Sequence, residues 1–378
     1  MSSIYNPFSL DLVTGKDLFN RVKEKEELAR YARSGGNVVL MSPRKSGKTF
    51  LVKELLAQLE QEGMIIAYVD LFSVVSVHDF IQKFWSALLC GFGNGIDPGT
   101  FIQKASDLFK HITAGFSLTR DDQPRWFIKL DHDDRFQETL GNILRDLYEY
   151  VQKEKVRACI VLDEFQEIAN LKESKQLEGV LRGQIQFHHD ISYIFVGSRR
   201  TKLREIFSDS RRPFYKSAFY YDLEAITKEE FTQYIIDKFE SSGKICSQDA
   251  ADLIYDRVRG YAYYVQKLSL LSWDLTDKVL DADFVDKVAF GRLIDSERYE
   301  FESIWDRLKT RNNRVLLRAL ADEPTSKPYA HDLLRRYSFS LGGIQTSMKA
   351  LLADDIIEID ENGLYRITDP VLVYWARR

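Results

Sequence analysis

Three adjacent residues, Gly47, Lys48 and Thr49, combine the groups that proteins use to hold a triphosphate and its cation. A glycine lets the backbone approach an anion, a lysine can reach the β and γ phosphates, and a hydroxyl can bind Mg²⁺. Successive backbone N–H groups and the start of a helix add further positive potential. The same segment, SPRKSGKT, also contains Ser42, Pro43, Arg44, Lys45 and Ser46.

This segment departs from the phosphate-loop pattern G-x-x-x-x-G-K-[ST] at one position, because Ser42 stands where the first glycine belongs. Its context still fits. The apolar run Val38–Met41 predicts a buried strand before the loop, and a helical pattern follows from about residue 50 to residue 61. The alternative is an ordinary strand-to-helix turn, which leaves the junction of strand and GKT unexplained. We therefore predict ATP as the ligand.

Two adjacent acids, Asp163 and Glu164, end a second apolar run, RACIVLDE. The first can hold Mg²⁺ through water, and the second can orient or deprotonate the water that attacks the γ phosphate. Acids at a strand end are also often merely solvated. In a parallel sheet, however, all strands end at one edge, so the phosphate loop and these acids can meet there.

Further candidates follow a third apolar run, SYIFV, where Ser198 can sense the γ phosphate and Arg199 or Arg200 can neutralise charge. A solvated turn is the alternative for these arginines. Arg211 and Arg212 precede the expected strand 218–223, and each is a candidate to act in trans on a neighbouring subunit. We therefore include Ser198, Arg199 and Arg211 among the predicted catalytic residues.

Strands and helices alternate through the first part of the chain. The expected strands are 64–69, 157–164, 192–196 and 218–223, and the expected helices include 50–61, 77–89 and 135–153. Residues 91–131 interrupt the alternation. Glycines 91–99 predict a turn there, followed by a helix at 101–112 and a hairpin of 115–118 with 125–130.

The second half has a different pattern. Thr227-x-x-Glu230 predicts a capping box that opens an all-helical region reaching about residue 290. Four helices between 301 and 352 then precede strands 356–360 and 364–368, which Asn362-Gly363 joins as a hairpin. We predict a core at 1–225 with an insertion at about 91–131, a helical lid at 226–296 and a winged helix at 297–378.

Composition limits the partners. The net charge of −4 argues against general polyanion binding, although a local basic face stays open. Cys90, Cys159 and Cys246 share no metal-type spacing and indicate reduced thiols in the cytoplasm. The start of the chain lacks the pattern of a signal peptide, and no apolar run approaches the ~20 residues needed to span a bilayer. We expect no membrane partner.

With these pieces in place, the chain resembles the archaeal-type P-loop ATPases, a branch of the AAA+/STAND NTPases, over nearly its whole length. The motifs that carry the resemblance are NPFS…FNR, SPRKSGKT, LDEFQ, VGSRR, PFY, GYAYY and DPVLVYW. The resemblance implies an α/β fold whose five-stranded parallel sheet has the AAA+ strand order, with a helical lid and a C-terminal winged helix. It also implies that ATP and Mg²⁺ bind between sheet and lid, with Arg21 contributing to the base site.

Two positions depart from the family. Serine at position 42 is frequent in this branch and should permit binding. Tyr263 stands where replication-initiator relatives carry a lid arginine, which implies weak sensing of the γ phosphate and slow hydrolysis.

Two functions remain open. The first is a slow ATP hydrolase that acts as a switch, in which ATP binding repositions the winged helix. The second is a sequence-directed DNA-binding protein with a structural or regulatory nucleotide site. The expected recognition helix, 341–349, carries one basic residue, and Arg311 to Arg378 hold 10 Lys/Arg against 9 Asp/Glu. Duplex DNA, a protein partner and self-association therefore all stay open.

Overall fold

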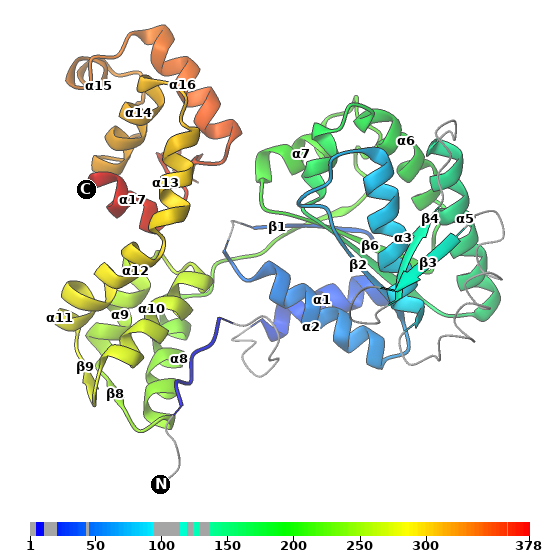
Figure 1. Cartoon of the computed structure of the whole chain (residues 1–378), viewed down its shortest axis with the longest axis horizontal. Coiled ribbons are helices and arrows are strands. Elements are labelled where there is room, and N and C mark those ends of the chain that lie inside the picture. The colour runs from blue at the N-terminus through cyan, green and yellow to red at the C-terminus, as the bar shows by residue number, and fades with distance from the viewer. Residues whose placement is uncertain are drawn as a thin grey trace. The chain divides into compact units, whose positions relative to one another are not determined.

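The computed structural model describes the chain except for residues 1–4, 11–20, 43–44, 94–113, 119–123, 129–135 and 361. Contacts divide it into two compact units. The α/β unit is Leu12–Glu224, and the helical unit combines Met1–Asp11 with Ala225–Arg378. Figure 1 shows both units, and each is described here by itself.

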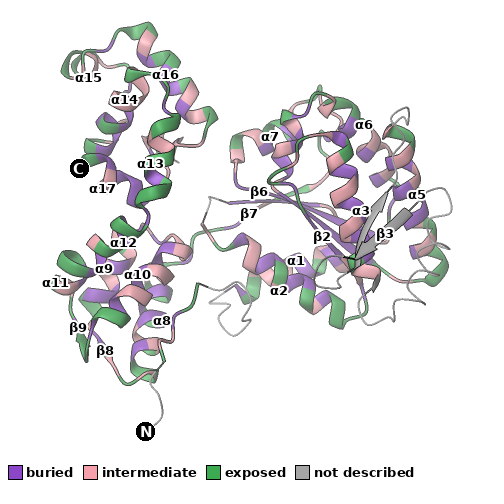
Figure 2. Ribbon diagram, viewed as in Figure 1, coloured by how far each residue is buried: buried purple, intermediate pink, exposed green. Residues whose placement is uncertain are grey.

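The α/β unit is built on a five-stranded parallel sheet with the order β2-β5-β6-β1-β7. Its strands are β1 (Val38–Met41), β2 (Ile65–Asp70), β5 (Ala158–Asp163), β6 (Ile191–Gly197) and β7 (Phe219–Asp222). The three central strands, β1, β5 and β6, are buried along their whole length (Figure 2), which explains their uninterrupted apolar sequences. This sheet confirms the expected fold class.

Helices cover both faces of the sheet (Figure 1). One face carries α1 (Val22–Arg33) and α2 (Lys48–Gln61), and the other carries α3 (Val77–Gly93), α5 (Phe136–Glu154), η1 (Phe165–Asn170), α6 (Ser174–Ile185) and α7 (Arg200–Ser208). Alternate strand residues serve the two cores: Val161 packs toward α2, whereas Leu162 packs toward α3. The carboxyl ends of the strands are thereby held at one fixed edge.

The region after α3 differs in part from the prediction. Gly91 and Gly93 belong to α3 rather than to a turn. A side chain at position 91 would clash with the backbone of Ile66, so glycine there permits the close approach of α3 to β2. The hairpin forms from β3 (Ala114–Leu118) and β4 (Pro124–Ile128), as expected. The helix predicted at 101–112 lies outside the described residues.

The first part of the helical unit, which is the predicted lid, packs against the N-terminal segment. Its elements are α8 (Lys228–Ser241), β8 (Ile245–Cys246), α9 (Gln248–Arg257), α10 (Ala262–Leu275), β9 (Val279–Leu280), α11 (Ala282–Phe284), η2 (Val285–Ala289) and α12 (Phe290–Ser296). Phe8 packs against Tyr234 and Phe239. The prediction that this region is entirely helical was wrong, because β8 and β9 form a short parallel pair.

The winged helix follows. Its elements are α13 (Arg298–Arg307), α14 (Arg311–Asp322), α15 (His331–Arg336), α16 (Leu341–Ala353), β10 (Ile357–Ile359), β11 (Tyr365–Ile367) and α17 (Pro370–Arg377). The sequence analysis did not identify α17. The signal was present, because Asp369 caps its first turn and Pro370 occupies the position where proline fits a helix start. Among the described residues, no helix is long and apolar enough to cross a bilayer.

Candidate nucleotide site

The phosphate loop leaves β1 at the edge of the sheet where the parallel strands end. Gly47 adopts φ 87° and caps α2, so the first-turn N–H groups of α2 are presented at this edge. Ser42 is not among the described residues with positive φ, which explains why serine is accommodated where the pattern has glycine. Pro43 and Arg44 lie outside the described residues.

Lys48 is the first residue of α2 and is buried, with 6% of its surface exposed. Its ammonium Nζ donates a hydrogen bond to the backbone oxygen of Ser42 at 3.2 Å. The hydroxyls of Ser42 and Ser46 hydrogen bond across the loop. Thr49 follows and is half-buried. The Lys48 side chain thus folds back over the loop and hydrogen bonds to its first residue.

Asp163 ends β5 and is also buried. The hydroxyl of Tyr68, on the neighbouring strand β2, donates to its Oδ2, and the backbone N–H of Glu164 donates to its Oδ1 at 2.9 Å. Burial raises the pKa of Asp163, while the Tyr68 hydrogen bond and the charge of Lys48 act in the opposite direction. The charge of Lys48 is therefore close enough to Asp163 to favour the ionised carboxylate.

Glu164 has φ 51°, a left-handed conformation that is uncommon for residues other than glycine and clusters at functional sites. Ser198 Oγ donates to its Oε2 at 2.9 Å, and Gln166 Nε2 donates to the same oxygen. Among the described residues, no hydrogen-bond donor lies at Oε1. Two donors thus fix the carboxylate and leave one oxygen to accept a proton from water.

Gln166 and Tyr68 are site residues that the sequence analysis missed. Gln166 is fully buried, and a side chain at Gly197 would clash with its Oε1. A larger residue at Gly197 would therefore displace the amide that hydrogen bonds to Glu164. Tyr68 lies two residues before the end of β2, so its side chain is on the same face of the sheet as that of Asp70. It reaches Asp163 only because β2 pairs with β5.

The predicted arginines lie in different surroundings. Arg199 contacts Glu167 of η1, with 3.6 Å between Nη1 and Oε1. Arg211 is exposed and held by Asp209, with 2.8 Å between Nη2 and Oδ2. Its neighbour Arg212 is instead half-buried and forms an ion pair with Glu178, which has no exposed side-chain surface. The roles of Arg199, Arg211 and Arg212 stay predictions.

Arg21 was predicted to contribute to the base site. It is buried at the start of α1 and forms an ion pair with Glu24, three residues further along the chain. The preceding residues 11–20 are outside the described part of the chain, so the predicted base site stays a prediction.

The edge therefore brings together Lys48, Asp163, Glu164 and Ser198. Its potential metal ligands, the Thr49 hydroxyl and the Asp163 carboxylate, are oxygen donors only. That set fits Mg²⁺, which prefers one or two carboxylates combined with phosphate and water oxygens. A glycine-capped helix start and a buried lysine fit a polyphosphate anion.

Comparisons with known proteins agree with this geometry. Residues 18–268 match the family described as "ATPase domain predominantly from Archaea". Residues 299–378 match the family described as "Probable winged helix domain". No match is found among curated proteins.

Solved structures share the fold. A Walker-type ATPase of Pyrococcus abyssi is 16% identical with a TM-score of 0.69, over 98% of this chain and 99% of that one. The ORC2 protein of Aeropyrum pernix, solved in ADPNP–ADP complexes, is 17% identical with a TM-score of 0.56, over 96% and 93%. The ORC1 protein of the same organism, solved with DNA, is 14% identical with a TM-score of 0.50, over 97% and 94%.

Proposed function

The chain belongs to the family of ATPase domains found predominantly in Archaea and binds ATP as an ATPase, and from this premise we propose a slow, Mg²⁺-dependent switch. In this proposal Lys48 binds the β and γ phosphates, Thr49 and Asp163 hold Mg²⁺, and Glu164 activates water. Ser198 keeps Glu164 in position, as its 2.9 Å hydrogen bond to Oε2 suggests. When bound, the cation would neutralise charge that develops on the phosphates.

The observation that carries the switch is a set of hydrogen bonds between the lid and the winged helix. Two tyrosines of the lid motif GYAYY take part. Tyr261 donates to the backbone oxygen of Thr368 at 2.8 Å, and Tyr264 donates to Asp369 Oδ2 at 2.6 Å. Burial and the Asp369 charge raise the pKa of Tyr264, so its hydroxyl stays protonated and remains a donor.

Two arginines extend this seam, which we define as the contacts of residues 257–264 with residues 367–374. Arg259 donates to the backbone oxygen of Ile367 at 3.0 Å. Arg257 donates to the Tyr374 hydroxyl at 3.3 Å, and Tyr374 packs on Phe290 with 4.8 Å between ring centroids. Because the seam joins lid and winged helix within one compact unit, a lid displaced by nucleotide would carry the winged helix with it.

Slow turnover is supported by the lid residue at position 263, which is a tyrosine and stacks edge-on with Tyr264 at 5.3 Å. A tyrosine supplies no cation to the γ phosphate. The cytoplasm is the proposed location, since all three cysteines are free thiols, as a reducing compartment would keep them.

A distance measurement tests the switch. The exposed residues Lys53, on α2, and Lys349, on α16, can be changed to cysteine and labelled with a fluorescence donor and acceptor, after Cys90→Ser removes the exposed native thiol. In the Glu164→Gln background, ATP should change the transfer efficiency relative to ADP. Adding Lys48→Ala should abolish the change.

An Asp369→Ala variant serves as the control for the seam, because it removes the acceptor of Tyr264. It should broaden the distribution of transfer efficiencies in every nucleotide state. Identical distributions with ATP and ADP in a protein that demonstrably binds both would refute the switch and leave the ATPase assignment intact.

A further inference from the structure

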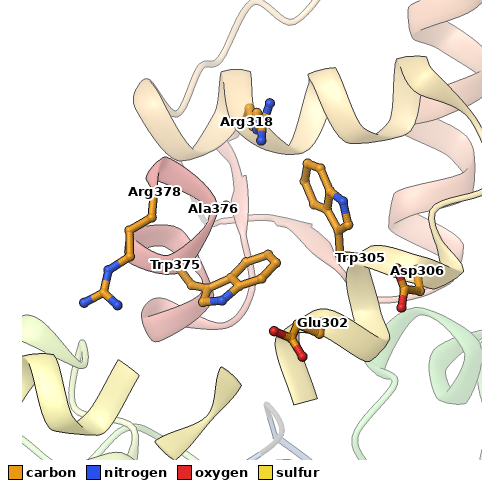
Figure 3. A pocket seen from close by; sticks show the side chains of 7 residues that line it. All are labelled: Glu302, Trp305, Asp306, Arg318, Trp375, Ala376 and Arg378. Carbon is orange, nitrogen blue, oxygen red and sulfur yellow. The ribbon is translucent and has the colours of Figure 1, made fainter. Parts of the chain in front are cut away.

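The winged helix contains a cavity of about 500 Å³ that the recognition helix α16 does not line. Residues of α13, α14 and the C-terminal end of the chain surround it (Figure 3). Its lining residues are Glu302, Trp305, Asp306, Arg318, Trp375, Ala376 and Arg378. The cavity belongs to neither the nucleotide edge nor the seam.

Two of the five tryptophans of the chain line this cavity. Trp305 and Trp375 meet at 69°, with 5.9 Å between ring centroids, and Phe301 packs against Trp375 from the buried side of α13. Both indoles are only half-buried. Partly exposed indoles held by a buried ring are suited to stack on a planar aromatic ligand.

Three arginines, Arg311, Arg314 and Arg318, recur at helical spacing along one face of α14. Among the described residues, none of the three has a carboxylate within ion-pair distance. The guanidinium groups of Arg314 and Arg318 instead lie over the Trp305 ring, at 5.5 and 4.9 Å from its centroid. The stripe therefore presents positive charge beside the indoles, with room for an anionic backbone.

The remaining lining residues further restrict the chemical class of the ligand. Asp306 and the oxygen of Glu302 that does not contact Arg298 can accept hydrogen bonds from the amino groups of a base. A cationic ligand is disfavoured, because Arg318 already lies over the Trp305 face. An aromatic group with amino donors and an attached phosphate would match the indoles, the carboxylates and the arginines, respectively.

We propose that this cavity binds an unpaired base of a single-stranded nucleic acid, with the phosphates of the strand along the arginine stripe of α14. The base stacks on Trp375, and Glu302 or Asp306 accepts from its exocyclic amino group. This assigns nucleic-acid binding to the side of the winged helix formed by α13, α14 and α17 rather than to α16. It goes beyond the proposed switch and does not depend on ATP turnover.

Fluorescence anisotropy of the full chain with a labelled oligodeoxycytidylate of about 20 nucleotides tests the proposal at roughly 50 mM salt. Trp375→Ala should weaken binding about tenfold or more by removing a stacking surface. Arg318→Glu, a change at an exposed side chain, should weaken binding and lower the salt slope by about 0.7 for each phosphate that the variant no longer neutralises. Lys349→Glu, on exposed α16, is the matched control and should bind as wild type.

Unchanged ATP turnover and an unchanged unfolding midpoint show that each variant is folded. The proposal is overturned by wild-type protein that does not bind the strand, or by equal binding of wild type, Trp375→Ala and Arg318→Glu. Tighter binding of a duplex that Lys349→Glu abolishes would assign recognition to α16 instead. Competition by cytidine monophosphate as strong as that by the strand would identify the ligand as a free nucleotide.

Discussion

The nucleotide edge of the α/β unit and the arginines of α14 beside the tryptophan cavity of the winged helix hold their charged groups in different ways. At the edge, charged side chains bond to neighbours: Asp163 accepts from Tyr68, Glu164 accepts from Ser198, and Lys48 donates to a backbone oxygen. In the cavity, Arg318 lies on an indole with no carboxylate partner among the described residues.

This difference indicates how each region recognises its ligand. Groups that orient one another are preorganised for one geometry, so the edge should respond strongly to single conservative substitutions. Cations without carboxylate partners attract an anion through a field that salt screens, so the cavity should respond to charge and to ionic strength. The two regions should therefore be separable by mutation.

The largest expected effect is on turnover. If Glu164 is the base that activates water, as we propose, Glu164→Gln should lower kcat by roughly 10²- to 10⁴-fold and retain the affinity for ATP. A steady-state ATPase assay combined with equilibrium binding measures both quantities. The affinity for the single-stranded oligonucleotide should not change. Turnover equal to that of wild type would contradict the role of Glu164.

Lys48→Ala should lower the affinity for ATP by about 100-fold, since this variant cannot make charge-assisted hydrogen bonds to phosphate. Calorimetric titration with ATP measures the change. Lys53→Ala, on the exposed face of the same helix, is the control and should bind ATP as wild type. If Lys48→Ala also lost affinity for the single-stranded oligonucleotide, the two regions would be linked. That result would contradict the conclusion that they can be separated by mutation.

Tyr68→Phe tests whether hydrogen bonds between side chains orient the groups at the nucleotide edge. The variant removes a donor to Asp163 and leaves the ring in place. Because groups that orient a metal ligand typically contribute tenfold or more to metal affinity, the Mg²⁺ concentration for half-maximal turnover should rise by about tenfold. Tyr150→Phe, a tyrosine of the same unit on α5, is the control. An unchanged Mg²⁺ dependence would make Tyr68 a packing residue only.

The smallest effect concerns stability. His188 of the α/β unit is buried, stacks on Tyr148 at 4.7 Å and contacts the Tyr193 hydroxyl at 2.8 Å, and burial lowers its pKa to about 4. The sole histidine of the helical unit, His331, is exposed.

Since unfolding returns the His188 pKa to its usual value near 6.5, the unfolded chain binds a proton that the folded chain rejects. The folded state therefore loses stability as the pH falls through 6.5, by roughly 1 kcal/mol between pH 6.5 and 5.5. Urea denaturation of wild type and His188→Gln measures it. The stability difference between them should shrink with acidification, and a constant difference would contradict the assignment.

Much of the fold follows from local patterns. The apolar runs before Ser42, Glu164 and Ser198 became the three central strands, because a strand buried on both faces needs a continuous apolar sequence. Thr227 and Glu230 formed the expected capping box. Local pattern misled at Gly91, where a close approach to Ile66, rather than a turn, requires glycine.

The site was predictable only in part. That Lys48, Asp163, Glu164 and Ser198 lie at one edge could be predicted because each lies at or after the end of a buried strand, and a parallel sheet places those ends together. Tyr68 and Gln166 could not be predicted, since a tyrosine in a strand and a glutamine after an acid have no distinctive spacing. Their roles depend on partners that strand pairing and the turn at Glu164 supply.

The sequence by itself determined the order of strands and helices and the chemistry at the strand ends, because these depend on contiguous residues. Beyond such local caps, tertiary structure decided which polar groups have partners. Arg211 and Arg212 are adjacent, yet one is exposed beside Asp209 and the other is half-buried beside Glu178. Trp305 and Trp375, 70 positions apart by their numbers, share a cavity only because α13 and α17 pack together. Burial and charge pairing depend on distance in space, which sequence position does not fix.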